Sequence, residues 1–308
     1  MQSDSDTRLA PADMIFVAGG SFRMGSDRHY REEAPQHQAS IDSFWIDRDP
    51  VTNARFRTFV AATGYTTFAE RAPDPRDYPG VAEELLRPAS LVFTPPPQPV
   101  PLHDISRWWS LIPGANWRHP YGPGSGIDGL DDHPVIHVAL EDAVAYCAWA
   151  GKDLPTEVEW EFAARGGLDG ADYAWGDLFA PDGRNMANIW HGEFPHRNSA
   201  EDGFERTSPV GAFPANGYGL NDMIGNVWEW TKDRYTSHHV ASTVKPCCVP
   251  RNPQNPIAEQ DGLARMVLKG GSHLCAPNYC RRYRPAARQA HTIDTTTTHI
   301  GFRCVWRR

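Results

Sequence analysis

The chain has 308 residues and 40% of them are hydrophobic, so it is long enough for a single large domain with a sizeable core. Its formal net charge is −8 and it has no long run of Lys and Arg, which makes nucleic acid and anionic membranes poor partners. No apolar run approaches about 18 residues, so the sequence predicts no membrane-spanning helix.

The N-terminal part is expected to start with a tail and to continue into short strands. Met1–Asp13 is polar and acidic and lacks the basic start and apolar core of a secretory signal. Residues 1–12 are therefore expected to be a flexible N-terminus, and the protein is expected to be cytoplasmic. In Met14–Met24 two short apolar segments flank a pair of glycines, which is typical of a hairpin. Ile41–Ile46 is predicted to be a further strand.

Three helices follow from apolar periodicity and capping signals. Thr52–Ala62 has an apolar face and stops before Gly64. Leu140–Ala150 is expected to end at Gly151 as its C-cap. Thr156–Arg165 begins with a capping box and is stopped by two glycines.

The remaining segments predict loops and short strands. Residues 70–134 are rich in Pro and Gly and have weak periodicity, so they are predicted to form a long packed loop region. Asn226–Trp230, Met266–Lys269 and Gly301–Val305 are predicted to be strands. Because the chain contains 27 Pro and 26 Gly, we expect an α+β fold with little regular secondary structure, forming one domain over residues 13–308.

Two cysteines near the C-terminus are the first candidates for chemistry. Cys275 and Cys280 lie five residues apart, and Pro277 between them disfavours a helix and allows a turn that brings the two sulfurs together. Two thiolates without a complete zinc ligand set favour copper(I), and the arginines after Cys280 favour the thiolate form. Their spacing alone favours a disulfide or two buried free thiols over a metal site, so the surrounding residues must decide.

The residues around these cysteines resemble a known family. Gly270–Cys275, Tyr279–Arg288 and His299–Cys304 resemble the catalytic end of formylglycine-generating enzymes, within the sulfatase-modifying factor superfamily. Further segments that resemble this family, in the same order, are 19–25, 51–53, 114–120, 133–135, 153–157, 187–190, 193–195, 216–220 and 225–230. Many of these segments also occur in superfamily members without this activity, so the cysteine pair is the discriminating feature.

The resemblance implies a fold, a reaction and a set of catalytic residues. The fold would be C-type-lectin-like. The reaction would use molecular oxygen to convert the cysteine of a C-x-P-x-R motif, in an unfolded or nascent sulfatase, into Cα-formylglycine. Cys275 and Cys280 would hold copper(I), and Ser272 and Trp228 would line the site. From the sequence alone, Ser272 also fits a turn after two glycines, and Trp228 also fits an ordinary core position.

A substrate groove and two calcium sites complete this expectation. The groove would run past Cys275 and accept an extended peptide, with Trp108, Trp109, Trp117 and Arg118 as candidate wall residues. The resemblance assigns the first calcium site to Asn188, Ile189, Asp202 and Phe204. It assigns the second site to Asp222, Gly225, Val227 and Glu229. Calcium binds hard oxygen ligands from carboxylates, amides and loop carbonyls, and in a loop-rich chain it can substitute for regular structure.

The sequence departs from the family pattern at several positions. Ala276 stands where many relatives carry His, which suggests that His273 could assist catalysis instead. Pro50 stands where some relatives carry Glu, which puts one calcium contact in doubt. Cys147 and Cys304 match a family disulfide, and in a reducing cytoplasm we expect them to be close but not necessarily bonded. The adjacent cysteines at 247 and 248 are expected in a flexible loop, without an assigned role.

Two other functions remain open at this stage. The first is a non-enzymatic binding module of C-type-lectin-like fold, in which Cys275 and Cys280 form a structural disulfide. The second is an iron-dependent enzyme of the ergothioneine-type sulfoxide synthases, which bind iron through histidines. His133 and His137 have a suitable spacing for that site, but Ala139 stands where a Glu would be needed and a helical iron-binding domain is missing.

Overall fold

The structure is a computed structural model, and it describes residues 13–82, 85–239, 249–253 and 264–308. The predicted flexible N-terminus at 1–12 and the cysteines at 247 and 248 lie outside the described residues. Helices are few and strands are short, as the sequence predicts for an α+β fold with little regular structure. None of the helices in the described part of the chain has the length and apolarity needed to cross a bilayer.

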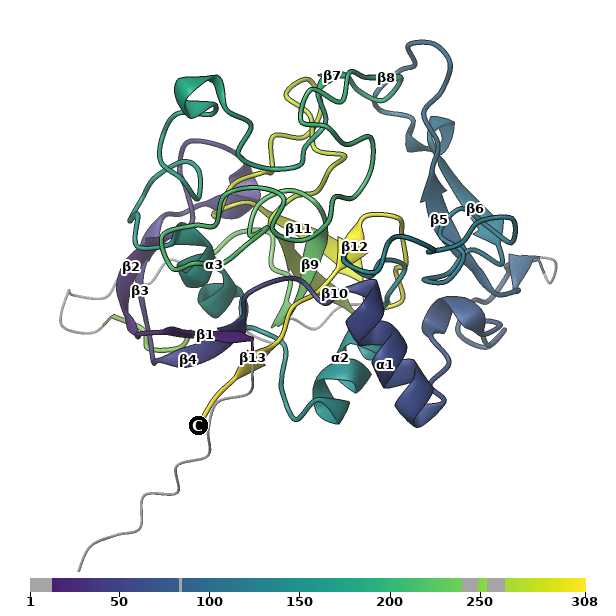
Figure 1. Cartoon of the computed structure of the whole chain (residues 1–308), viewed down its shortest axis with the longest axis horizontal. Coiled ribbons are helices and arrows are strands. Elements are labelled where there is room, and N and C mark those ends of the chain that lie inside the picture. The colour runs from purple at the N-terminus through teal and green to yellow at the C-terminus, as the bar shows by residue number, and fades with distance from the viewer. Residues whose placement is uncertain (1–12, 83–84, 240–248, 254–263) are drawn as a thin grey trace, which may run out of the picture.

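A four-stranded sheet lies at the centre of the molecule (Figure 1). Its strands, in spatial order, are β11 (Arg288–Thr292), β10 (Arg265–Lys269), β9 (Trp228–Arg234) and β12 (Ile300–Gly301). The first three strands pair in antiparallel fashion, and β12 runs parallel to β9. The sheet therefore brings segments near residues 228, 269, 289 and 300 together, although they lie far apart in the chain.

The N-terminal segment is not the hairpin that the sequence predicts. β1 (Met14–Val17) pairs with β4 (Phe44–Asp47), which also pairs with β13 (Val305–Trp306), whereas β2 (Gly20–Met24) pairs with β3 (His37–Ile41). The two glycines mark a change of sheet. A Cβ on Gly19 would lie 2.4 Å from the carbonyl oxygen of residue 41, so the close passage of the two backbones requires glycine there.

Two further predicted strands are each divided in the structure. The segment 41–46 is split between β3 and β4, because the chain changes sheets around residues 42 and 43. The segment 301–305 is split between β12 and β13, which belong to different sheets. Apolar patterning cannot reveal such a change of sheet, because both halves continue to bury side chains.

The helices follow their local signals closely. α1 spans Asn53–Thr63, where Thr52 caps the N-terminus and Gly64 ends the helix in the left-handed conformation. α2 spans Leu140–Trp149 and ends at Ala150, one residue before the expected cap. Shorter 3-10 helices cover Arg31–Glu33, Phe68–Glu70, Ile105–Arg107 and Pro181–Gly183.

α3 spans Glu157–Arg165 and lies against the central part of the molecule (Figure 1). Its capping box is formed as predicted, since Thr156 Oγ1 accepts from the backbone N–H of Glu159 and the Glu159 carboxylate accepts from the backbone N–H of Thr156. Gly166 ends the helix with φ of 56°.

The predicted loop region 70–134 contains a hairpin that the sequence analysis missed. β5 (Ala89–Phe93) and β6 (Trp109–Pro113) pair in antiparallel fashion. The Pro-rich connection between them hides the usual hairpin signal, because it is much longer than a tight turn. A second small hairpin pairs β7 (Gly192–Glu193) with β8 (Arg197–Asn198), and both hairpins border the site described below.

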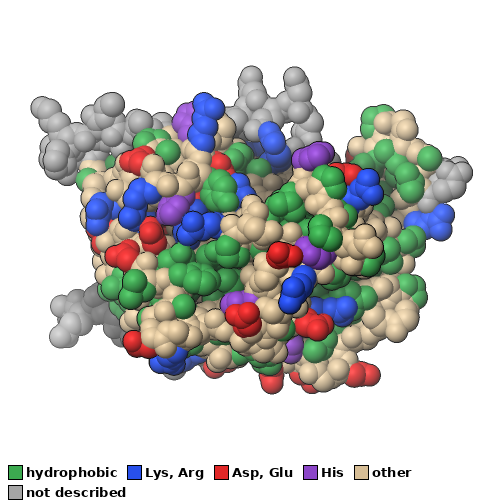
Figure 2. All heavy atoms as spheres, turned by 90° about the horizontal axis from the view of Figure 1, so that it is seen from above, with side chains coloured by type: hydrophobic (Ala, Val, Ile, Leu, Met, Phe, Trp, Pro, Cys, Tyr) green, Lys and Arg blue, Asp and Glu red, His purple; other side chains and the backbone are tan. Residues whose placement is uncertain are grey.

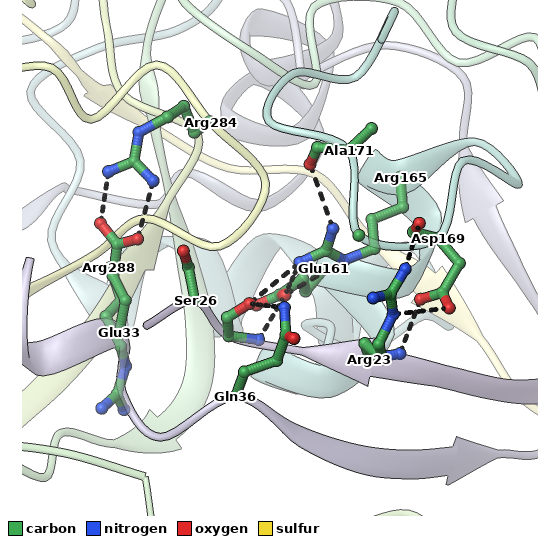
Figure 3. A network of polar contacts seen from close by, with 12 residues as sticks. Arg23, Ser26, Glu33, Gln36, Glu161, Arg165, Asp169, Ala171, Arg284 and Arg288 are labelled. Atoms are coloured by element: carbon green, nitrogen blue, oxygen red, sulfur yellow. Dashed lines mark hydrogen bonds and ion pairs between the residues drawn. The ribbon is translucent and has the colours of Figure 1, made fainter. Parts of the chain in front are cut away.

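Buried ion pairs tie the chain after the cysteines to distant elements. Arg284 binds Glu33 through two hydrogen bonds of 2.5 and 2.7 Å, and Arg165 binds Glu161 at 2.7 Å (Figure 3). Arg288 binds Glu157 at 2.7 and 2.9 Å. Burial alone would raise the pKa of Glu157, but the charges of Arg288, His239 and Lys269 together outweigh it and hold this pKa at about 2.

Candidate functional site

The segment with the two cysteines begins where β10 ends. Lys269 is fully buried at this end, and its Nζ lies 2.9 Å from Glu161 of α3. Gly270 and Gly271 follow with φ of 96° and 73°, and a Cβ on Gly271 would lie 2.8 Å from the carbonyl oxygen of Arg282. The two glycines therefore let the chain leave the sheet and pass close to its own returning strand.

Two successive turns then bring the cysteines together. The N–H of Cys275 donates to the carbonyl of Ser272 at 2.9 Å, and the N–H of Cys280 donates to the carbonyl of Ala276 at 2.8 Å. The two Sγ atoms lie 3.4 Å apart, and both side chains are buried. Both cysteines are free thiols in this structure, so the turn predicted from Pro277 is present and the disulfide alternative is not.

The two thiols differ in their electrostatic surroundings. The hydrogen bond from Cys275 and the guanidinium of Arg282, whose Nη1 lies 3.7 Å from this sulfur, together outweigh the effect of burial and lower the pKa of Cys280 to about 6. Burial, together with the bond to Cys280, raises the pKa of Cys275 well above its usual range. The pair therefore holds one proton at neutral pH, with Cys280 as the thiolate and Cys275 as the hydrogen-bond donor.

A cavity of about 400 Å³ reaches both sulfurs. Its apolar lining residues are Leu91, Ile105, Trp108, Trp109, Phe194 and Leu274. Its polar lining residues beyond the thiols include Gln289, His291, Thr297 and His299. We refer to this space as the cysteine cavity. A peptide side chain can reach the thiols through it, so the sulfurs are close together and accessible.

The structure brings most of the predicted site residues to this cavity. Ser272 and Trp228 line it beside the cysteines, and so do Trp108 and Trp109. Ser272 Oγ accepts a hydrogen bond from the N–H of Leu274 at 3.2 Å, so its side chain also stabilises the turn. The backbone N–H of Trp228 donates to the carbonyl of His299 at 2.8 Å, which holds the start of β9 next to the segment that carries His299.

The other two predicted groove residues lie elsewhere. Trp117 is in the main core, with its ring 5.2 Å from that of Phe56. Arg118 stacks on the ring of Trp117 at 4.4 Å and pairs with Glu70. Neither side chain belongs to the lining of the cysteine cavity. The aromatic clustering in the sequence could not separate core residues from wall residues, because packing and ligand contact favour the same residue types.

The sequence analysis missed the histidines of the cavity. The imidazole of His299 lies 4.9 Å from the ring of Trp109, and its Nδ1 bonds Thr297 Oγ1 at 2.7 Å. Burial lowers the pKa of His299 well below its usual value, so this ring is neutral. By contrast, Nδ1 of His273 donates to the carbonyl of Asn226 at 2.8 Å and its ring lines a different cavity, so His273 does not take the place of the histidine missing at Ala276.

The residues of the first predicted calcium site lie together in one pair of loops. Asn188 is fully buried, its Nδ2 donates to the carbonyl of Arg206 at 2.8 Å, and its Oδ1 is a buried acceptor without a partner in the structure. The carboxylate of Asp202 accepts from the N–H of Ile189 and from the N–H of Phe204, both at 3.1 Å. An unpaired amide oxygen beside a buried carboxylate suits a hard cation.

The second predicted set carries no such unpaired oxygen. Both carboxylate oxygens of Glu229 accept from Arg303 at 2.7 Å, and one of them also accepts from Trp160 Nε1. Asp222 accepts from the N–H of Gly211 at 2.7 Å. Burial raises the pKa of Asp222 to about 6. This second calcium site, including Gly225 and Val227, remains a prediction based on the family resemblance.

The second buried thiol pair and the two histidines of the iron-site alternative also have defined contacts. Cys147 and Cys304 are buried free thiols with Sγ atoms 3.2 Å apart, so they are close and unbonded, as the sequence analysis allowed. His137 uses both ring nitrogens, on Ser90 Oγ at 2.6 Å and on the carbonyl of Pro120 at 2.9 Å. His133 bonds Thr207 instead, so these two histidines do not form the iron site of the sulfoxide synthase alternative.

Comparison with known proteins agrees with this geometry. The family model of the sulfatase-modifying factor enzyme 1-like domain matches residues 2–308. The chain is 54% identical over 294 residues to the formylglycine-generating enzyme of Mycobacterium tuberculosis, covering 95% of this chain and 97% of that protein. It is 44% identical over 303 residues to the formylglycine-generating enzyme of Bos taurus, covering 96% of this chain and 74% of that protein.

A solved structure extends the comparison to the fold. PvdO from Pseudomonas aeruginosa matches with a TM-score of 0.62 at 23% sequence identity, covering 96% of this chain and 94% of that one. At this identity the likeness concerns the fold alone. It supports the predicted fold class, an α+β fold with little regular secondary structure.

Proposed function

Because this chain belongs to the sulfatase-modifying factor family of formylglycine-generating enzymes, which are oxidative protein-modifying enzymes, we propose that it converts a cysteine of a client sulfatase into Cα-formylglycine with copper(I) and molecular oxygen. The observation that carries this proposal is the pair of free thiols, Cys275 and Cys280, with sulfurs 3.4 Å apart at an accessible cavity. The client segment is a C-x-P-x-R motif in an extended, unfolded region, since a folded motif could not enter the cavity.

The donor set suits copper(I). Soft thiolates select a soft, low-coordination ion, and zinc would require about four ligands. Within the described ranges no group of three or more His, Cys, Asp or Glu side chains is arranged to hold a metal, so a two-sulfur site is what this cavity offers. When bound, copper(I) would supply the centre at which the client thiol and oxygen react.

The net reaction defines what the protein must arrange. The client carbon loses a C–H and a C–S bond and gains C=O, and the sulfur leaves as sulfide. Reduction of oxygen to water takes four electrons. Two come from the client, and two external thiols, which become one disulfide, supply the other two. A site for this chemistry must admit a peptide and oxygen while excluding bulk water.

The residues of the chain would divide these tasks. Cys280 is held as a thiolate by Cys275 and Arg282, so it is ready to bind a soft cation without a separate base. The apolar wall around Trp108 and Phe194 would exclude water from the reacting carbon. Ser272 and Trp228 border the sulfurs and would position the client thiol and oxygen.

We also propose calcium at Asn188 and Asp202, with carbonyl oxygens from the same loops. The buried, unpaired Oδ1 of Asn188 supports this site, because an acceptor in that position is costly without a partner. The loop that it would stabilise runs directly into Trp190, whose N–H donates to the carbonyl of Cys275 at 3.0 Å. Calcium would therefore stabilise the cysteine segment through Trp190.

The direct test is conversion of a peptide. A synthetic peptide with C-x-P-x-R is incubated with the enzyme, copper(I), oxygen and a thiol reductant, and its mass is followed. We expect the thiol to be replaced by an aldehyde with the wild type, and no conversion with Cys275→Ala or Cys280→Ala. Cys147→Ala, which removes another buried free thiol, serves as the matched control and should retain turnover. A peptide that binds and stays unchanged would favour the binding-module alternative.

A further inference from the structure

A second cavity lies beside the cysteine cavity and has no assigned role. It has a volume of about 300 Å³ and shares Leu274 with the cysteine cavity. The rings of Phe93, Trp190 and Phe194 pack between the two spaces, with centroids 5.2 to 5.7 Å apart. A peptide that occupies the cysteine cavity can therefore continue across these rings into the second cavity.

Two arginines contribute positive charge to the lining of this second cavity. Arg206 holds its guanidinium over the ring of Tyr121, 3.6 Å from the centroid, and its backbone carbonyl accepts from Asn188 Nδ2 at 2.8 Å. Arg197 lies on β8, and its carbonyl accepts from Trp190 Nε1 at 3.1 Å. Both arginines line the cavity. We refer to this space as the arginine cavity.

Neither of these arginines is neutralised within the molecule. Among the residues that the structure describes, no carboxylate lies within ion-pair distance of the Arg197 or Arg206 guanidinium. Glu205 is the one acidic residue of the lining, and His196 on the same rim is paired with Glu193 at 3.3 Å. The lining thus carries one net positive charge in a chain whose formal net charge is −8.

The arginine cavity lies beside β8, on a face of mixed charge. β7 and β8 lie at the top of Figure 1 and so face the viewer in Figure 2, where basic and acidic side chains are interspersed over the face. By contrast, Arg28, Arg165 and Arg284, which line another cavity, are each bound to a carboxylate. An arginine stacked on an aromatic ring keeps its planar N–H groups free to bind a carboxylate side-on.

We propose that the arginine cavity binds an acidic side chain of the client polypeptide, near the cysteine that is oxidised. This inference rests on the proposed function, because it assumes that a peptide occupies the cysteine cavity. The packed rings of Phe93, Trp190 and Phe194, which separate the two cavities, span about 10 Å. An extended chain crosses this distance in about three residues, so the acidic residue lies about three positions from the client cysteine. The Arg206 guanidinium is the main contact. Arg197 adds to the positive electrostatic potential of the cavity, and the negative charge of Glu205 reduces it.

The experiment uses paired peptides that contain the C-x-P-x-R motif. A single Glu is placed in turn at each x of the motif and at each position flanking the motif, and every Glu peptide has a Gln partner. KM for conversion is measured with the intact enzyme. Affinity for the same peptides with the client Cys→Ser is measured by fluorescence anisotropy, at low and high salt, so that binding is followed without any reaction.

We expect one position, about three residues from the cysteine, at which the Glu peptide binds about three- to tenfold more tightly than its Gln partner. Arg206→Gln should reduce this ratio to about one, Glu205→Gln should increase it, and added salt should weaken it. Arg308→Gln changes the net charge equally at an exposed site outside the cavity lining, and it should leave the ratio unchanged.

Two different failures can be told apart. If no peptide is converted by the intact enzyme, the proposed function is wrong, while anisotropy with the unreactive peptides still tests the arginine cavity. If peptides are converted or bound with no preference for Glu at any position, the assignment of the arginine cavity is overturned. The same holds if Arg206→Gln keeps the full preference for the Glu peptide in a variant whose circular dichroism matches the wild type.

Discussion

Nη1 of Arg282 lies 3.7 Å from the sulfur of Cys280, while Nη2 of the same guanidinium binds Glu32 at 2.6 Å. Glu32 comes from the short helix near the N-terminus, so a distant segment sets the position of the charge beside the Cys280 thiol. Tyr30 adds to this support, since its ring lies 4.0 Å from the Arg282 guanidinium. The ionisation of the cysteine pair therefore depends on the packing of residues 30–33 against the loop after Cys280.

The first prediction concerns the pH dependence of Cys280. Its pKa is lowered to about 6, so in the metal-free enzyme the thiolate should be present above this pH and should be lost as the pH falls through it. Arg282→Gln should move this midpoint upward by about one unit, because it removes a neighbouring positive charge. The rate of alkylation by iodoacetamide, measured from pH 4 to 9, reports the midpoint.

The control for this prediction is Arg281→Gln, which removes the same charge from the adjacent position. The side chain of Arg281 interacts with Tyr173 and Tyr283, not with the sulfur. It should therefore move the midpoint much less. Equal shifts in the two variants would mean that Arg282 lowers the pKa of Cys280 no more than Arg281 does.

The second prediction concerns the buried pair of Glu33 and Arg284. Both side chains are almost completely buried, so Glu33→Gln would leave the Arg284 charge without a partner and should lower the free energy of unfolding by about 3–5 kcal/mol. Glu32→Gln breaks the more exposed neighbouring pair and should cost about 1 kcal/mol or less. Urea unfolding of both variants provides the comparison, and equal costs would show that burial is not what makes the first pair important.

The structure explains which features the sequence could predict. The helices were predictable because their signals are local, as with the caps at Thr52, Thr156 and Gly64. The cysteine turn was predictable for the same reason. The strand pairing was not, because β4 takes its partners from residues 14–17 and 305–306, and no local pattern encodes a contact across 260 residues.

The site shows the same difference between local sequence signals and contacts that form only in the folded chain. The family resemblance pointed to Cys275, Cys280, Ser272 and Trp228, and these four residues do line one cavity. His291 and His299 were missed because they reach the cavity through β11 and the loop before β12, so only the folded sheet brings them beside the thiols. Trp117 was misplaced because an aromatic cluster in the sequence does not show which of its rings face the core.

The third prediction compares two histidines. His299 contacts Trp109 within the cysteine cavity, so His299→Gln should lower kcat/KM about tenfold through misplacement of the wall. His273 lies outside this cavity, and His273→Gln should have a smaller effect on kcat/KM. Because burial keeps His299 neutral, the pH profile between 5 and 8 should keep its shape in the His299 variant. A larger loss at His273 would instead support the sequence-based hypothesis that it assists catalysis.

The fourth prediction concerns calcium. A cation at Asn188 and Asp202 would bind the folded state only, so saturating calcium should raise the melting temperature, with about 2.7 kcal/mol of stabilisation at one hundred times Kd. Asp202→Asn should abolish this increase, whereas Asp172→Asn, a change at a carboxylate outside the site, should retain it. Scanning calorimetry with calcium, and with magnesium as a comparison, measures the effect. A melting temperature that does not respond to calcium would show that Asn188 and Asp202 do not form a calcium site.

The central claim is that the sulfurs of Cys275 and Cys280 hold one copper(I) ion. Anaerobic titration of the reduced protein with copper(I), in competition with a chromophoric chelator, tests it most directly. We expect the wild type and Cys147→Ser each to bind one equivalent of copper(I) tightly. We expect both Cys275→Ser and Cys280→Ser to lose this equivalent. Undiminished binding in either of the last two variants, or no binding in the wild type, would contradict it.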